Sequence, residues 1–223
     1  ITTDNYQAAA DADILVLAVK PQILQVVSEE LATTLTDKNP LVISIAAGVE
    51  TPHIENWLGK ALPVIRCMPN TPSRVSQGAS GLFANEHVNS EQKRQADEIF
   101  KSIGMVEWVT EEEQMHGITA LSGSGPAYFF LMMEALEDGA VKSGISRETA
   151  RKLAIQTVLG AAEMAKQSEL EPAQLKRNVM SPGGTTEKAI QSFEEGGIRT
   201  LFETAMRAAA DRSKELAEIL GKK

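Results

Sequence analysis

The chain has 223 residues, and 43% of them are hydrophobic, which is enough for a sizeable core in one large or two small domains. Its formal net charge of −8 argues against nucleic acid and against an anionic membrane surface as partners. No apolar run approaches the roughly 20 residues that span a bilayer, and no signal peptide is visible. The single cysteine, Cys67, excludes a disulfide within the chain and agrees with a cytoplasmic location.

The first half of the chain alternates short apolar runs with helical patterns. The continuous run at 13–19 is typical of a strand that is buried on both faces. Pro21 follows it and suits the first turn of a helix. The alternation predicts a right-handed α/β architecture with a Rossmann-like parallel sheet over residues 1–110. The expected strands are 13–19, 41–46, 64–68, 81–84 and 105–109, and the expected helices are 21–35, 51–58 and 90–103, with Ser90 as the cap of the last.

The second half, residues 111–223, contains only helical patterns. We expect Glu111, Glu112 and Glu113 to start the first helix of this half, and Ser146 to cap a later one. These helices carry more apolar faces than one small bundle buries, which predicts a subunit interface. Met68, Met132 and Met133 are interpreted as core residues. The expected helices are 111–121, 127–143, 146–167, 172–179, 187–195 and 198–220.

Three loops follow strands at the carboxyl edge of the predicted sheet, where such folds bind ligands. They are Val19-Lys20-Pro21, Ala46-Ala47-Gly48 and Pro69-Asn70-Thr71. Each also has a simpler interpretation: a solvated lysine, a plain tight turn, and an Asx-turn at Asn70. The residues alone leave these alternatives open.

A second candidate site is the loop 181–186, Ser-Pro-Gly-Gly-Thr-Thr, between two predicted helices. Gly183 and Gly184 allow a tight turn and a close approach of a ligand. Thr185 or Thr186 is placed to cap the next helix, whose free N–H groups suit a small carboxylate or phosphate. The simpler alternative is a capped helix–helix turn that binds nothing.

The stretch from Leu175 to Glu194, which contains this loop, resembles the signature of pyrroline-5-carboxylate reductase, the last enzyme of proline biosynthesis. The stretches Leu121-Ser122-Gly123-Ser124-Gly125-Pro126-Ala127-Tyr128, Ala18-Val19-Lys20-Pro21 and Arg66-Cys67-Met68-Pro69-Asn70-Thr71-Pro72 are also similar to that family. The resemblance covers essentially the whole chain. It departs at the start, where the family's first strand, glycine-rich turn and second strand are absent.

The resemblance implies reduction of 1-pyrroline-5-carboxylate to L-proline by hydride transfer to the imine carbon. NADPH is the implied cofactor, and NADH stays open because the segment that selects between them is missing. Interlocked helical domains are implied to form homodimers that assemble further in some members. Cofactor contacts are expected at Ala18, Val19, Lys20, Pro21, Ala46, Ala47 and Gly48, and at Asn70, which the resemblance places only in the same cleft.

The chemistry of a cyclic imine that bears a carboxylate makes two demands. The carboxylate must be held so that the C=N carbon faces the hydride donor, and the N–H groups around Gly184 meet this demand. The imine nitrogen must be protonated or hydrogen-bonded, and the hydroxyl of Thr186 is our choice of catalytic group. The expected substrate contacts are Asn178, Ser181, Gly183, Gly184, Thr185 and Thr186, with Glu112 added through the resemblance.

Two other functions are alternatives to this one: a dehydrogenase of another type and a non-catalytic module. A dehydrogenase of the 3-hydroxyacid type usually has a catalytic lysine in the first helix of its helical domain, but residues 111–121 contain none. A non-catalytic helical dimerisation module would not need the complete loop 181–186. The three histidines lack metal-ligand spacing, so no metal site is expected.

The absent glycine-rich turn leads to one more expectation. A dinucleotide fold places the pyrophosphate on that turn, and no Gly-x-Gly-x-x-Gly follows a strand in this sequence. The 223 residues by themselves are therefore expected to bind the dinucleotide poorly, and to aggregate through the exposed edge of the sheet.

Overall fold

The structure is a computed structural model, and it describes residues 1–35 and 38–221. The chain forms two compact units. The first comprises Ile1–Pro126 together with Met206–Lys223, and the second comprises Ala127–Ala205. Across the described ranges, no helix is both long enough and apolar enough to cross a membrane.

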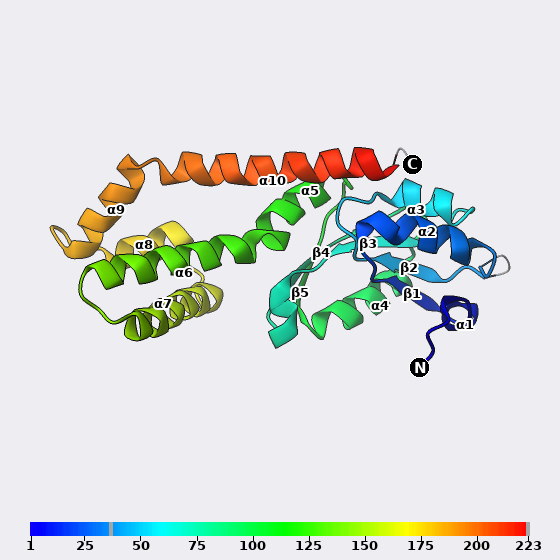
Figure 1. The fold of residues 1–223 in the computed structure, drawn as a ribbon, viewed down its shortest axis with the longest axis horizontal. Helices are drawn as coiled ribbons and strands as arrows, with labels where there is room; N and C mark the ends of the chain where they lie inside the picture. The colour runs from blue at the N-terminus through cyan, green and yellow to red at the C-terminus, as the bar shows by residue number, and fades with distance from the viewer. Residues whose placement is uncertain (36–37, 222–223) are drawn as a thin grey trace. The chain divides into compact units, whose positions relative to one another are not determined.

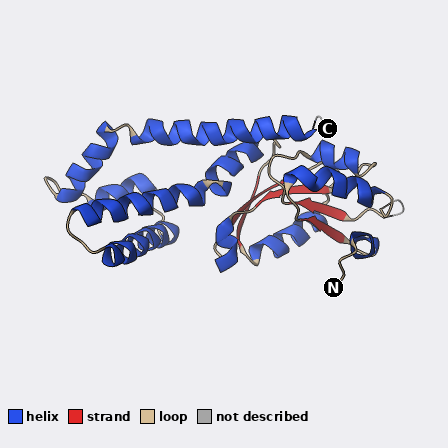
Figure 2. Cartoon of the chain, viewed as in Figure 1, coloured by secondary structure: helices blue, strands red, loops and turns tan. Residues whose placement is uncertain are grey.

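The first unit is built on a five-stranded sheet in the order β1-β2-β3-β4-β5 (Figures 1 and 2). Strands β1, β2 and β3 are parallel, as predicted, with Val42 opposite Val64 in the β2–β3 pair. Strand β4 runs antiparallel to β3 and parallel to β5, so the sheet is mixed. The reason is the short connection 69–77, since a parallel pair needs a crossover of about a dozen residues or more. The strands are β1 (Ile14–Leu17), β2 (Leu41–Ser44), β3 (Val64–Met68), β4 (Gly78–Ala84) and β5 (Gly104–Trp108).

Helices cover both faces of this sheet. Side chains alternate along a strand, so Val42 packs on one face, while Leu41 and Ile43 pack on the other. The first face is covered by α2 and α3, and the second by α4. Leu220 of the C-terminal helix also packs against the first face. The helices of this unit are α1 (Asn5–Ala10), α2 (Pro21–Ala32), α3 (Thr51–Trp57), α4 (Ser90–Lys101) and α5 (Gln114–Ile118), with a 3-10 turn at Thr71–Val75 and a π-helix at Thr119–Gly123.

Helix starts in this unit differ from the prediction in three places. Helix α4 is capped by Asn89 rather than Ser90, in a reciprocal capping box with Gln92. The three glutamates 111–113 precede α5 instead of forming its first turn. Helix α1 was not predicted, and it starts because Asp4 accepts hydrogen bonds from the N–H groups of the first turn.

The second unit contains helices only, as predicted. Ser146 caps α7 as expected, since its hydroxyl accepts the N–H of Thr149. The apolar helix α6 is not buried within the chain: Phe130 and Leu131 are 62% and 64% exposed, and Met132, expected in the core, is 38% exposed. The unit is formed by most of α6 (Gly125–Lys142), by α7 (Arg147–Gln167), α8 (Pro172–Val179) and α9 (Thr185–Glu195), and by the start of α10 (Ile198–Gly221).

Candidate functional site

The ends of strands β1, β2 and β3 lie at one edge of the sheet, because these neighbouring strands are parallel. The structure therefore brings together the three loops that the sequence placed there. Ala18 and Lys20 are exposed after β1, and Pro21 is the first residue of α2. No side chain caps α2; Pro21 has no N–H, and the N–H of Ile23 bonds the carbonyl of Lys20 at 3.0 Å, so the N–H of Gln22 is the donor that this first turn offers beside the exposed residue Lys20. This edge suits an anionic ligand.

The loop after β2 contains Ala46, Ala47 and Gly48. Gly48 has φ +75°, a conformation that favours glycine. A Cβ at this position would also lie 3.3 Å from Leu216 Cβ and 3.3 Å from the carbonyl oxygen of Ser213. Gly48 therefore allows α10 to pack closely against the loop.

Asn70, in the loop after β3, uses both ends of its side-chain amide within the protein. Its Nδ2 donates to the carbonyl oxygen of Ser122 at 3.1 Å, and its Oδ1 accepts the N–H of Ala79 at 2.9 Å. The Asx-turn interpretation was wrong, because the Oδ1 acceptor bonds β4 rather than the following turn. Asn70 thus ties the sheet edge to the π-helix, and a cofactor contact at this residue stays a prediction.

A buried polar cluster lies next to the β2–α3 loop. Glu112 Oε1 accepts the N–H of Thr51 and Nη1 of Arg66, each at 2.8 Å, and its Oε2 accepts the hydroxyl of Thr51 at 2.8 Å. Arg66 on β3 is only 4% exposed. A buried guanidinium needs a partner of opposite charge, and Glu112 supplies it. Because Thr51 begins α3, the same carboxylate also satisfies that helix start.

His116 on α5 lies in the core, a position that the sequence analysis did not predict. It is 2% exposed, and its Nδ1 lies 2.9 Å from the hydroxyl of Ser213 on α10. Burial lowers the pKa of His116, and the nearby Arg66 lowers it further. The partners are 97 positions apart, so no local pattern could have indicated the contact. Cys67 on β3 is buried, and burial raises the pKa of its thiol to about 12.

The loop 181–186 lies in the second unit, between α8 and α9. Helix α9 begins at Thr185 with Gly184 as its cap, so the prediction that Thr185 or Thr186 caps it was wrong. Gly183 has φ +71°, and its N–H donates to Glu187 Oε2 at 2.8 Å. Since no side chain caps α9, its first N–H groups stay free to bind an anion.

The remaining loop residues are accessible. Ser181 and Thr185 are exposed, and Thr186 is half-buried. Asn178 is exposed on α8, where its Oδ1 accepts Nε2 of Gln174 at 2.8 Å. The structure thus gathers the predicted substrate residues 178–186 at one helix–loop–helix turn, while Glu112 belongs to the first unit.

An apolar groove of about 650 Å³ runs along the second unit. Its lining is almost free of polar atoms. Leu201 on α10 is 68% exposed and Phe193 on α9 is 53% exposed in the single chain. The lining residues are Tyr128, Leu131, Met132, Ala135, Leu136, Phe193, Ile198, Leu201, Phe202 and Ala205.

Comparisons with known proteins agree with this arrangement. Residues 112–216 match the family model for pyrroline-5-carboxylate reductase dimerisation, and residues 1–48 match that for NADP oxidoreductase coenzyme F420-dependent. The pyrroline-5-carboxylate reductase of Pseudomonas aeruginosa is 52% identical over 99% of this chain and 81% of its own length. That of Methanosarcina acetivorans is 45% identical over 98% of this chain and 80% of its own.

Solved structures give the same result. A pyrroline-5-carboxylate reductase from Coxiella burnetii has a TM-score of 0.92 and 54% identity, covering 97% of this chain and 80% of that one. A Plasmodium falciparum pyrroline carboxylate reductase with NADP bound has a TM-score of 0.88 and 37% identity, covering 97% and 81%. The sheet edge, the helical unit and the sequence identity along nearly the whole chain all agree. The chain therefore belongs to the pyrroline-5-carboxylate reductase family.

Proposed function

We propose that this protein reduces 1-pyrroline-5-carboxylate to L-proline with NADPH, the last step of proline biosynthesis, in the cytoplasm. The observation that carries the proposal is the loop 181–186, where an uncapped helix start faces outward beside two threonine hydroxyls. The family of the chain supports the same reaction. Dehydrogenation of a 3-hydroxyacid and a purely structural role are not favoured.

The substrate carboxylate binds the free N–H groups at the start of α9. The partial positive charge of a helix N-terminus favours an anion there. Ser181 and Asn178 border the same turn and complete this carboxylate site. Gly183 and Gly184 have no side chains, so the carboxylate reaches the backbone at these two positions.

The hydroxyl of Thr186 bonds the imine nitrogen. A protonated or hydrogen-bonded imine accepts hydride more readily, and a fixed hydroxyl adds orientation to this effect. No strong side-chain acid is needed when the substrate binds as the iminium. This turn therefore binds the carboxylate of the substrate and holds a proton at its imine nitrogen.

The cofactor binds at the carboxyl edge of the sheet, within residues 1–110. The donor set there fits a dinucleotide: an uncapped helix start, the Lys20 ammonium and three adjacent strand ends. When bound, NADPH supplies the hydride. Ala18, Val19, Lys20 and Pro21 line one side of it, Ala46, Ala47 and Gly48 line the next, and Asn70 faces the same edge.

The helical residues 111–223 bind substrate and join two copies of the chain. A groove with so little polar lining favours a cover in water, and the matched dimerisation model, over residues 112–216, includes all the residues that line it. We propose that the cover is the partner's equivalent surface in a homodimer, with further assembly of dimers in a larger homo-oligomer.

The natural full-length protein tests the reaction directly. With 1-pyrroline-5-carboxylate present, NADPH absorbance should fall and proline should accumulate in equal amount. NADH in place of NADPH measures the cofactor preference. A 3-hydroxyacid with NADP+ tests the competing dehydrogenase activity. Absence of turnover with 1-pyrroline-5-carboxylate and either reduced cofactor contradicts the proposal.

A further inference from the structure

We propose that Glu112 is a positioning residue for the cofactor loop, rather than a ligand of the substrate. The cofactor loop comprises residues 45–50, between β2 and α3. This inference rests on the proposed function, because it assumes that Ala46, Ala47 and Gly48 line the dinucleotide.

The Glu112 carboxylate is already hydrogen-bonded within the protein. Its two oxygens accept three hydrogen bonds of 2.8 Å, two from Thr51 and one from Arg66. The Arg66 guanidinium, 4% exposed, depends on this carboxylate for its neutralisation. A substrate that recruited Glu112 would compete with Thr51 and Arg66 for the same carboxylate.

Two of these three hydrogen bonds fix the end of the cofactor loop. Thr51 is the residue directly after the cofactor loop, and both its N–H and its hydroxyl are held by Glu112. At the other end, the N–H of Ile45 bonds the carbonyl of Leu17 at 3.2 Å, which fixes the loop to β1. Between these ends, Gly48 packs against α10. The loop is therefore held at its start, middle and end.

In the described part of the chain, the side chain that accepts from the N–H and the hydroxyl of Thr51 is that of Glu112. The cap residue of α3, Glu50, makes no side-chain cap bond. Loss of the Glu112 charge therefore frees the end of the cofactor loop and weakens the hold on Arg66. The free energy lost appears in dinucleotide binding, since the loop must then be ordered by the ligand.

Four variants of the full-length protein, two of them controls, separate the two roles. Glu112→Gln removes the charge, and Thr51→Val removes one hydroxyl while leaving Glu112 in place. Thr51→Ser keeps that hydroxyl and is the conservative control. Glu111→Gln is the matched control for charge, because Glu111 is the exposed neighbour of Glu112. Calorimetric titration with NADPH, without substrate, measures binding independently of turnover.

We expect Glu112→Gln to weaken NADPH binding roughly tenfold, the equivalent of about 1.4 kcal/mol. Thr51→Val should weaken it in the same direction, while Thr51→Ser and Glu111→Gln bind as the unchanged protein does. At saturating NADPH, the KM for 1-pyrroline-5-carboxylate should stay within about twofold of its original value in Glu112→Gln.

Two results overturn the inference. A raised KM for 1-pyrroline-5-carboxylate in Glu112→Gln at saturating NADPH makes Glu112 a substrate ligand. Unchanged NADPH binding in both Glu112→Gln and Thr51→Val removes it from the cofactor loop. If Glu112→Gln does not fold, Thr51→Val decides alone by its NADPH affinity. The titration needs no substrate, so failure of this inference can be distinguished from failure of the proposed reaction.

Discussion

Thr186 is the residue on which the proposed chemistry depends most. It is the second residue of α9, and the cap of that helix is Gly184. Thr186→Ala therefore removes a hydroxyl that does not cap the helix, so the loss of about 1 kcal/mol that follows removal of a side-chain cap does not arise. We expect turnover to fall roughly 100-fold or more, the scale of a lost proton-positioning group, with an unchanged thermal midpoint.

Steady-state assays with 1-pyrroline-5-carboxylate, together with thermal melts, check this prediction. Thr200→Ala is the control, because Thr200 is an exposed threonine near the start of α10 and outside the loop. Thr186→Ser should retain most of the turnover, since it keeps the hydroxyl. Normal turnover and substrate affinity in Thr186→Ala would remove Thr186 from the mechanism.

His116 should make stability depend on pH in a defined window. Its pKa is lowered from 6.5, mainly by burial and then by Arg66, although Glu113 and Glu50 oppose the shift. The unfolded chain therefore takes up the proton first as pH falls. The stability that neutral His116 contributes is present above pH 6.5 and is lost as pH falls below it.

Denaturant unfolding between about pH 7.5 and about pH 5 measures this loss. The free energy of unfolding should fall less over that range in His116→Asn, which keeps a polar atom near Ser213, than in the unchanged protein. His87→Asn, on the loop after β4, is the control. The neighbouring Glu113 does not obscure the window, because the hydrogen bond that it accepts from Lys214 holds its pKa below the usual 4.5. An equal fall in both proteins contradicts the assignment.

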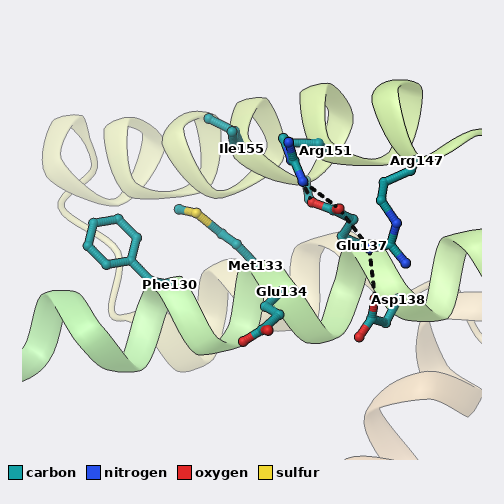
Figure 3. Close-up of a pocket in the computed structure, with 9 residues that line it drawn as sticks. Phe130, Met133, Glu134, Glu137, Asp138, Arg147, Arg151 and Ile155 are labelled. Carbon is teal, nitrogen blue, oxygen red and sulfur yellow. Dashed lines mark hydrogen bonds and ion pairs between the residues drawn. The ribbon is translucent and has the colours of Figure 1, made fainter.

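At the scale of elements, α6 and α7 are joined by a charge cluster (Figure 3). Glu137 on α6 is 8% exposed. Its Oε1 accepts from Arg147 at 2.8 Å and from Arg151 at 3.0 Å, and its Oε2 accepts from Arg151 at 3.0 Å. Arg151 and Arg147 lower the pKa of Glu137, so this carboxylate stays charged down to acid pH.

We expect Glu137→Gln to lower the thermal midpoint, because the amide cannot accept all three hydrogen bonds and Arg151 loses its counter-charge, while Arg147 keeps Asp138 at 2.9 Å. Glu134→Gln is the matched control, since Glu134 is an exposed glutamate on the same helix, α6. Differential scanning calorimetry at neutral pH compares them. Equal midpoints for the two variants would mean that the cluster adds nothing to the packing of α6 on α7.

At the scale of the whole molecule, the decisive feature is the apolar groove, which we propose is covered by a second copy of the chain. Leu201 lines the groove and is 68% exposed in the single chain. Leu201→Glu would place a charge in the interface without a partner, a cost that a dimer cannot offset. We expect sedimentation to show dissociation into monomers. Thr204→Glu adds the same charge to α10 outside the groove and should leave the assembly intact. Dimers of Leu201→Glu with unchanged affinity contradict the proposed interface.

Local patterns in the sequence were sufficient for most elements. Strand β3 and helix α8 have the predicted bounds, because apolar periodicity, Pro172 and the residues around each turn act over a few positions. The family was also correctly identified from short motifs. The positions of Asn178 and residues 181–186 at one turn follow from the sequence, while their contacts with ligands remain predictions.

Other features depend on residues that meet only in the folded chain. The antiparallel β3–β4 pair, the bonds between Glu112 and Thr51 across 61 positions, and the contact between His116 and Ser213 across 97 were not predicted. Local periodicity states which face of an element is apolar, but not which distant partner it meets. Burial then decides the role of each polar side chain, since a group withdrawn from water must find its partner within the protein.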